Sequence, residues 1–99
     1  MKTEKIILLD LHIEGMKKKL QDFKWNVVTV TDIFGPTELD REYDKIIDYA
    51  KNNRKIVVIT QDQGLIKRCI DLGIDVVQID MDDLAQIADD ELSKRFGKF

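Results

Sequence analysis

The sequence lacks most of the features that mark secreted or membrane proteins. It has one cysteine, Cys69, so neither an intrachain disulfide nor a cysteine zinc site can form. No apolar run approaches the roughly 20 residues that span a bilayer, and no apolar leader with a small-residue cleavage site opens the chain. These absences predict a cytoplasmic protein that does not enter a membrane.

An excess of positive charge is also lacking. The net charge of −3 argues against a protein that coats nucleic acid by bulk electrostatics, although it allows a local basic patch beside a cleft. The 99 residues are 43 % hydrophobic and 35 % charged, with one proline. This balance is too apolar for disorder, and the length predicts a single globular domain over residues 1–99.

Short aliphatic runs provide the pattern of a parallel sheet. Four runs read as strands that are covered on both faces, at residues 6–9, 27–30, 56–59 and 74–79. Apolar residues at helical spacing follow them and predict helices near residues 13–23, 43–50, 65–70 and from 84 into the tail 89–99. The alternation predicts an α/β fold, namely a three-layer sandwich with a four-stranded parallel sheet and helices on both faces.

One long connection interrupts this alternation. Residues 31–40 contain the only Gly-Pro pair and are predicted to form a loop, a kind of segment that often carries function in compact domains. Gly73 is predicted to end the third helix before the last strand.

Two aspartates follow the runs predicted as the first and third strands. The stretch KIILLDLH (5–12) places Asp10 at the end of the first, and KIVVITQD (55–62) places Asp62 just beyond the third. Ligands of open parallel sheets bind beyond the carboxyl ends of the strands, so both carboxylates are expected at that edge. They lie within a few ångströms of each other if the two strands are neighbours. Alternatively, Asp10 only ends a strand and Asp62 only caps a helix.

Two close carboxylates favour a cation between them, because each otherwise raises the pKa of the other. Ligand sets made only of oxygen suit Mg²⁺ or Mn²⁺, which retain water molecules and accept phosphate oxygens. Such an ion lowers the pKa of bound water and can support in-line attack on a phosphodiester.

Three stretches carry a resemblance to a known family: IILLDLHI, DKIIDYAKNNRKIVVITQDQGL and GIDVVQID. Together they resemble the PIN-like nuclease superfamily, in the short single-domain branch related to VapC-type toxins. The resemblance covers residues 5 to about 82. Its pattern is an aspartate ending the first strand, an acid on a helix, a basic-then-aliphatic strand and a Thr-x-Asp motif.

The resemblance implies a set of site residues. Asp10, Asp44 and Asp62 correspond to the metal ligands, and Thr60 is the hydroxyl neighbour in the catalytic group. Asp44 is preferred because its interval to Thr60 is the family's usual one. If the alignment is shifted, the substitutes for this helical acid are Asp40 and Glu42.

The activity implied by the resemblance is that of a Mg²⁺- or Mn²⁺-dependent endoribonuclease. Such an enzyme, with the activity of a toxin-like ribonuclease, hydrolyses single-stranded RNA with a metal-activated water. The resemblance also implies a homodimer and a possible antitoxin-like partner.

Two departures from the family pattern support an alternative. The family often has an acid two residues after Asp62, where this chain has Gln63 followed by Gly64, and an Asn where it has His12. A degenerate, non-catalytic PIN-like module that binds RNA or protein is the second hypothesis. A third is a Toprim domain, which the IEG at 13–15 and the later TQDQG faintly resemble.

Basic residues near the predicted site are candidates for RNA binding. The candidates are Lys17, Lys18 and Lys67, assisted by Arg41, Lys45 and Arg68. His12 is a candidate polar anchor or general base. A solvated helix face explains any one of the lysines equally well, and a hydrogen-bonded structural role explains the histidine.

Four further residues have structural and functional interpretations. Asp82 or Asp83 would supply the missing fourth acid or cap the last helix. Cys69 lies on an apolar stripe and is predicted to be buried. Trp25 is predicted to lie in the core or at an interface, with base stacking as the alternative.

Overall fold

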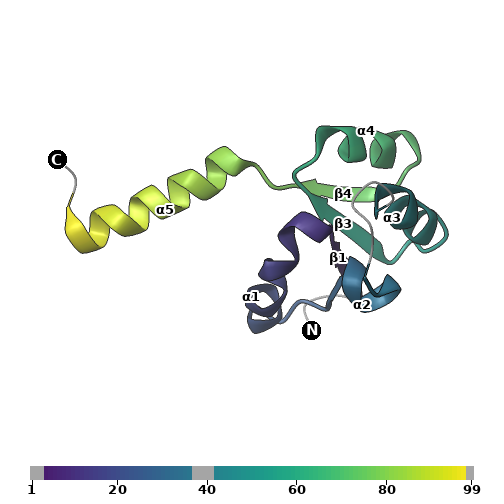
Figure 1. Cartoon of the computed structure of the whole chain (residues 1–99), viewed down its shortest axis with the longest axis horizontal. Coiled ribbons are helices and arrows are strands. Elements are labelled where there is room, and N and C mark those ends of the chain that lie inside the picture. The colour runs from purple at the N-terminus through teal and green to yellow at the C-terminus, as the bar shows by residue number, and fades with distance from the viewer. Residues whose placement is uncertain (1–3, 37–41, 98–99) are drawn as a thin grey trace.

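The computed structural model describes residues 4–36 and 42–97 and contains one parallel sheet. Its strands are β1 (Ile6–Leu9), β2 (Val27–Thr29), β3 (Ile56–Thr60) and β4 (Asp75–Gln78), arranged in the order β2-β1-β3-β4. Figure 1 shows this sheet with the helices around it. The prediction of an α/β fold with a four-stranded, all-parallel sheet is confirmed.

Helices lie on both faces of the sheet. The elements are η1 (Leu11–Met16), α1 (Lys17–Asp22), α2 (Val30–Phe34), α3 (Glu42–Lys51), α4 (Gln63–Asp71) and α5 (Met81–Phe96). Successive strand residues point to opposite faces. Leu8 and Val58 pack with α2, α3 and α4, whereas Leu9 and Ile59 pack with η1 and α1. The residues of β1, β2 and β3 have no exposed faces, which explains why their aliphatic runs are continuous, whereas β4 is mostly exposed, contrary to the prediction that it is covered on both faces.

The first predicted helix is divided in two. Asp10 accepts a hydrogen bond from the backbone N–H of His12 at 2.8 Å, which starts a 3-10 helix, and Ile13 has a non-helical backbone at φ −123°. Regular α-helix therefore begins only at Lys17. The chain then turns into β2 through Lys24, which adopts φ +76°. Because the 3-10 helix begins directly after Asp10, the residues that follow stay close to the end of β1.

The long connection predicted over residues 31–40 contains a helix that the prediction missed. Helix α2 begins at a capping box in which Thr29 Oγ1 accepts from the Asp32 N–H and Asp32 Oδ2 accepts from the Thr29 N–H, each at 3.0 Å. Helix α2 thus covers the first part of the predicted loop, and residues 37–41 lie outside the described ranges. Gly73 does follow the C-terminus of α4 as predicted, at φ +72°.

We expect Thr29→Ala to lower the free energy of unfolding by about 1 kcal/mol, because it leaves the Asp32 N–H without its cap. The substitution Thr29→Ser retains the hydroxyl and is the matched control. Thermal unfolding followed by circular dichroism measures both variants. Equal melting temperatures for the alanine and serine variants would show that the cap contributes nothing.

None of the helices within the described ranges combines the length and apolarity that crossing a bilayer requires.

Candidate functional site

The adjacency of β1 and β3 brings the two predicted aspartates to the same edge of the sheet. Leu9 lies opposite Ile59, so the residues that follow, Asp10 and Thr60, emerge side by side. The Thr60 hydroxyl donates to Asp10 Oδ2, and Thr60 Oγ1 accepts from the Asp62 backbone N–H at 3.1 Å. The Thr-x-Asp motif therefore connects Asp62 to Asp10 through the threonine side chain.

Asp10 is a buried and tightly held carboxylate. Only 1 % of the residue is exposed, and its two oxygens accept from the His12 N–H and from the Thr60 hydroxyl. Buried polar groups are almost always paired, and these two donors satisfy that requirement. They also fix the orientation of the carboxyl group at the end of β1.

Glu42, the first residue of α3, is buried without such partners. The residue is 0 % exposed, and within residues 4–36 and 42–97 neither of its carboxylate oxygens has a hydrogen-bond partner. Burial, and then the negative charge of Asp10, raise the pKa of the Glu42 carboxyl above its ordinary value. The backbone N–H of Leu11 and the side chain of His12 offset part of this shift, although neither meets hydrogen-bond geometry with Glu42.

Asp62 lies at the start of α4, where neighbouring groups fix its side chain. Its Oδ1 caps α4 by accepting from the Leu65 N–H at 2.8 Å, so the capping interpretation of this residue is correct. The Tyr43 hydroxyl lies near the Asp62 side chain at the same cavity. Burial, together with the charge of Asp62, raises the pKa of the Tyr43 hydroxyl, which keeps it protonated as a donor.

These residues surround a small open cavity. Its volume is about 210 Å³, and its lining residues are Asp10, His12, Tyr43, Gln61 and Asp62. The cavity lies beyond the carboxyl ends of β1 and β3, where ligands of parallel sheets bind. The buried carboxylate of Asp10 and the half-buried carboxylate of Asp62 therefore line the same hollow.

Asp44 is not brought to this edge of the sheet. Its side chain is 74 % exposed and accepts from Arg68 of α4 at 2.9 Å. Two residues along a helix are separated by about 200° around its axis, so Asp44 faces away where Glu42 faces inward. Glu42, named above as a substitute for this helical acid, is the one whose pKa the charge of Asp10 helps to raise. The other substitute, Asp40, lies outside the described residues.

The predicted RNA-binding residues have separate surroundings. Lys17 forms an ion pair with Asp32 at 2.8 Å, whereas Lys18 and Lys67 are exposed. His12 is exposed and lines the cavity.

The assisting basic residues do not gather at the cavity. Lys45 lies 5.7 Å from the centre of the Phe34 ring, and Arg68 pairs with Asp44. Arg41 lies outside the described residues.

The remaining candidates lie apart from the cavity. Glu14, the glutamate of the Toprim hypothesis, accepts from the backbone N–H and the hydroxyl of Thr31 at 2.8 Å each. Asp83 is exposed, and the side chain of Asp82 lies outside the described part of the chain. Cys69 is fully buried, as predicted.

No ready-made metal cage accompanies the cavity. In the part of the chain that the structure describes, no three His, Cys, Asp or Glu side chains converge into a group that could hold a metal ion. Comparison with known proteins finds no matching family model, no matching curated protein and no matching solved structure. Inferences about function therefore begin from the side chains at this edge of the sheet.

Proposed function

We propose that the chain is a PIN-like, Mg²⁺- or Mn²⁺-dependent ribonuclease whose site is formed by Asp10, Glu42 and Asp62. The observation that carries this proposal is the buried carboxylate of Glu42, which has no hydrogen-bond partner among the described residues and whose pKa is raised in part by the charge of the buried Asp10 carboxylate. A buried charge without a partner costs several kcal/mol, so such a group is either protonated or paired with a cation. A divalent ion between the two carboxylates would satisfy both.

The donors present suit such an ion. Each Asp10 oxygen accepts one hydrogen bond and has a further lone pair, and both Glu42 oxygens have none of theirs engaged. Mg²⁺ is commonly held by one or two carboxylates and completes its octahedron with water and substrate phosphate oxygens. Three converged ligands are therefore not required before the ion binds, and Asp62 supplies a further carboxylate across the cavity.

The chain's own residues would then position the ion and the substrate. A bound ion at this place lowers the pKa of a water molecule and stabilises negative charge on a phosphodiester. Thr60 and the His12 N–H hold Asp10, while the Leu65 N–H holds Asp62. The exposed His12 imidazole lies at the cavity, where a substrate phosphate would enter. The choice of single-stranded RNA as substrate rests on the resemblance to PIN-like proteins.

A degenerate, non-catalytic module is the second candidate, and Gly64 favours it. A Cβ atom at this position would lie 3.1 Å from Asp62 Oδ1, so the Asp62 carboxylate would have to shift by a few tenths of an ångström to admit a side chain. The chain lacks the acid that the family often has here. On this alternative, the same edge would bind RNA or protein without cleaving it. An antitoxin-like partner remains a prediction of the resemblance alone.

Cleavage of a fluorescent, unstructured RNA separates the two candidates. We expect the protein to cleave it with Mg²⁺ or Mn²⁺ and not with EDTA. The variant Asp62→Asn should lose cleavage by on the order of a hundredfold. Asparagine caps helices as well as aspartate does, so this variant should still fold.

Two outcomes would oppose the nuclease proposal. Equal cleavage by the protein and Asp62→Asn would indicate a contaminant. RNA binding without cleavage at any metal concentration would favour the degenerate module.

A further inference from the structure

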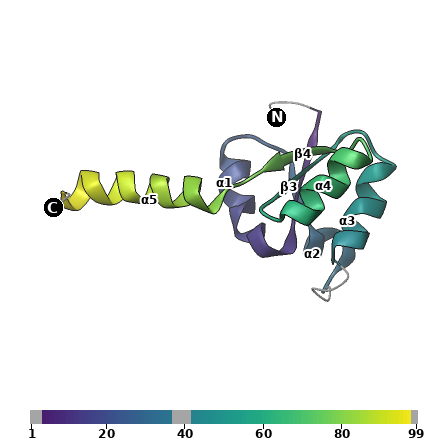
Figure 2. The ribbon, with the colours of Figure 1, turned by 90° about the horizontal axis from the view of Figure 1, so that it is seen from above.

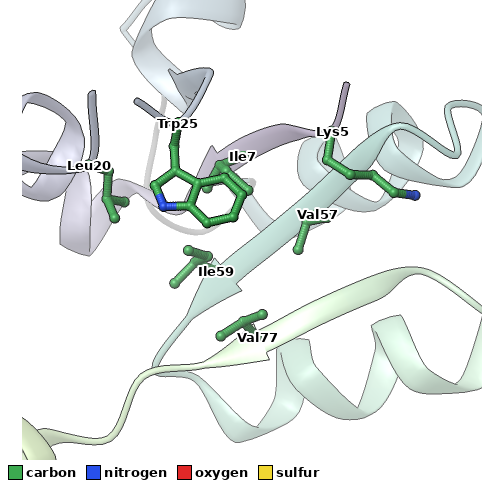
Figure 3. Close-up of a pocket in the computed structure, with 7 residues that line it drawn as sticks. All are labelled: Lys5, Ile7, Leu20, Trp25, Val57, Ile59 and Val77. Carbon is green, nitrogen blue, oxygen red and sulfur yellow. The ribbon is translucent and has the colours of Figure 1, made fainter. Parts of the chain in front are cut away.

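One face of the sheet is only partly covered. Helix α1 packs on this face through Leu20, but the part over β3 and β4 is open. An apolar hollow of about 480 Å³ lies there. Figure 3 shows the residues that line it: Lys5, Ile7, Leu20, Trp25, Val57, Ile59 and Val77. Val77 is 46 % exposed, although residues of a parallel sheet are normally covered on both faces. This hollow is called the open face below.

Helix α5 extends away from the rest of the molecule. Figures 1 and 2 show it projecting beyond the end of β4. Its side chains Leu92 and Phe96 are 57 % and 71 % exposed, and they follow Ala88 at intervals of four residues along one side, whereas Ile87, which is 65 % exposed, lies off that side. Gln86, Asp90 and Ser93 lie on the opposite side. A helix of this pattern normally buries its apolar side against another surface.

The connection into α5 allows packing against a sheet. Two residues join β4 to α5, as two residues join β3 to α4, and α4 packs back onto its own face of the sheet. Residue Ile79 continues the pairing of β4, because its N–H donates to the Thr60 carbonyl at 3.0 Å. The connection from β4 to α5 is therefore of a length that lets a helix pack on the sheet. The open face lacks a covering helix, and the apolar side chains of α5 suit that position.

Charge complementarity supports the same pairing. Helix α1, which borders the open face, carries Lys17–Lys19, whereas α5 carries three acids in succession, Asp89–Glu91. Lys17 pairs with Asp32 on one side of α1, and Lys19 lies about 200° around the axis, stacked on the exposed Phe23 ring at 5.5 Å. An acidic helix on the open face would thus lie beside a basic one.

We infer that α5 of one copy packs on the open face of a second copy, and the reverse, in a symmetric dimer formed by helix exchange. With α5 extended, none of the described residues fills the hollow over β3 and β4, so the helix of a partner of the same conformation can occupy it. Exchange of an identical element is a low-cost route to a dimer, because two-fold symmetry gives a closed assembly in which the open face of each copy is covered. This assembly is independent of the proposed nuclease activity.

The mass of the full chain in solution tests the exchange. Sedimentation equilibrium is expected to give twice the chain mass at micromolar concentration. The double variant Leu92→Asp/Phe96→Asp places two charges on the apolar side of α5, and Val77→Asp places one charge on the open face. Each would bury an unpaired charge, so the dissociation constant should rise by on the order of a hundredfold. Ile70→Asp, at a site on α4 that is 65 % exposed, is the matched control and should leave the mass unchanged.

Trp25, the only tryptophan, reports on the open face directly. Acrylamide should quench its fluorescence weakly in the dimer and strongly after dilution below the dissociation constant. A monomer at every concentration would overturn the inference. If Trp25 were shielded in that monomer, α5 would be closing on its own chain. A dimer that tolerates both sets of damaging variants would also overturn it. The measurements on the unsubstituted chain remain decisive if a variant fails to fold.

Discussion

Replacing Glu42 by Gln is expected to lower RNA cleavage by on the order of a hundredfold to a thousandfold. The same change at Asp44, to Asn, should alter cleavage by no more than about twofold, because exposed surface positions tolerate substitution. The two acids lie two residues apart on α3, yet one is buried and the other pairs with Arg68 at the surface. Glutamine preserves the size of the Glu42 side chain while removing its charge.

The measurement is the initial rate of cleavage at saturating Mn²⁺ for the protein and both variants. A matched comparison within one helix controls for changes in folding, which circular dichroism verifies. The reverse result, with cleavage lost in Asp44→Asn and retained in Glu42→Gln, would restore the site implied by the family interval and would contradict the site proposed from the structure.

Stability should depend on pH and on metal through the same carboxyl group. The pKa of Glu42 is raised in the folded protein, so the folded state binds this proton more tightly than the unfolded state. Without metal, the free energy of unfolding should be highest below the ordinary glutamate pKa. It should fall as pH rises through the raised value. Glu42→Gln removes this titration and should melt higher than the protein at neutral pH.

With divalent metal bound, the unsubstituted protein should instead melt at a higher temperature than Glu42→Gln. At one hundred times its dissociation constant, a bound ion stabilises the folded state by about 2.7 kcal/mol. For a domain of this length, that corresponds to a rise in melting temperature on the order of 10 °C. Because Glu42→Gln loses a ligand, its melting temperature should respond weakly to Mn²⁺, as should that of Asp10→Asn.

Melting curves at several pH values, with EDTA and with Mn²⁺, measure how stability depends on pH and on metal. Asp44→Asn is again the control and should respond to metal as the unsubstituted protein does. A metal response of equal size in the protein and in Glu42→Gln would place the ion elsewhere. A melting temperature that does not change with pH across the glutamate range would show that Glu42 is not the buried acid described here.

The sheet and its active edge could be predicted because both follow from simple patterns. Continuous aliphatic runs can be satisfied only by strands that are covered on both faces, and parallel strands direct their ends to one edge. That is why Asp10 and Thr60 could be assigned to the same edge before their hydrogen bond was known. The neighbouring positions of β1 and β3 were a condition of that prediction, and the structure meets it.

The helical acid could not be assigned by motif spacing alone. The family interval favours Asp44, whereas the helical pattern places Glu42 four residues before Ile46 and eight before Ala50, both of which are buried. That periodicity was the available signal for Glu42. Tyr43 was known only as an apolar helix residue, because its position near Asp62 depends on how α3 meets α4 in three dimensions.

Helix α2 was missed for a different reason. The Gly-Pro pair marked the whole segment as a loop, although Thr29 and Asp32 have the spacing of a capping box. The signal was local and short, and five helical residues contain too few apolar positions to show a period.

A crystal of the protein soaked in millimolar Mn²⁺, with anomalous scattering recorded, tests the central claim most directly. The proposed site predicts one strong anomalous peak within coordination distance of the Asp10 and Glu42 carboxylates, with Asp62 facing it across the cavity. An empty cavity at that concentration, or a peak held by Asp44 instead, would contradict it.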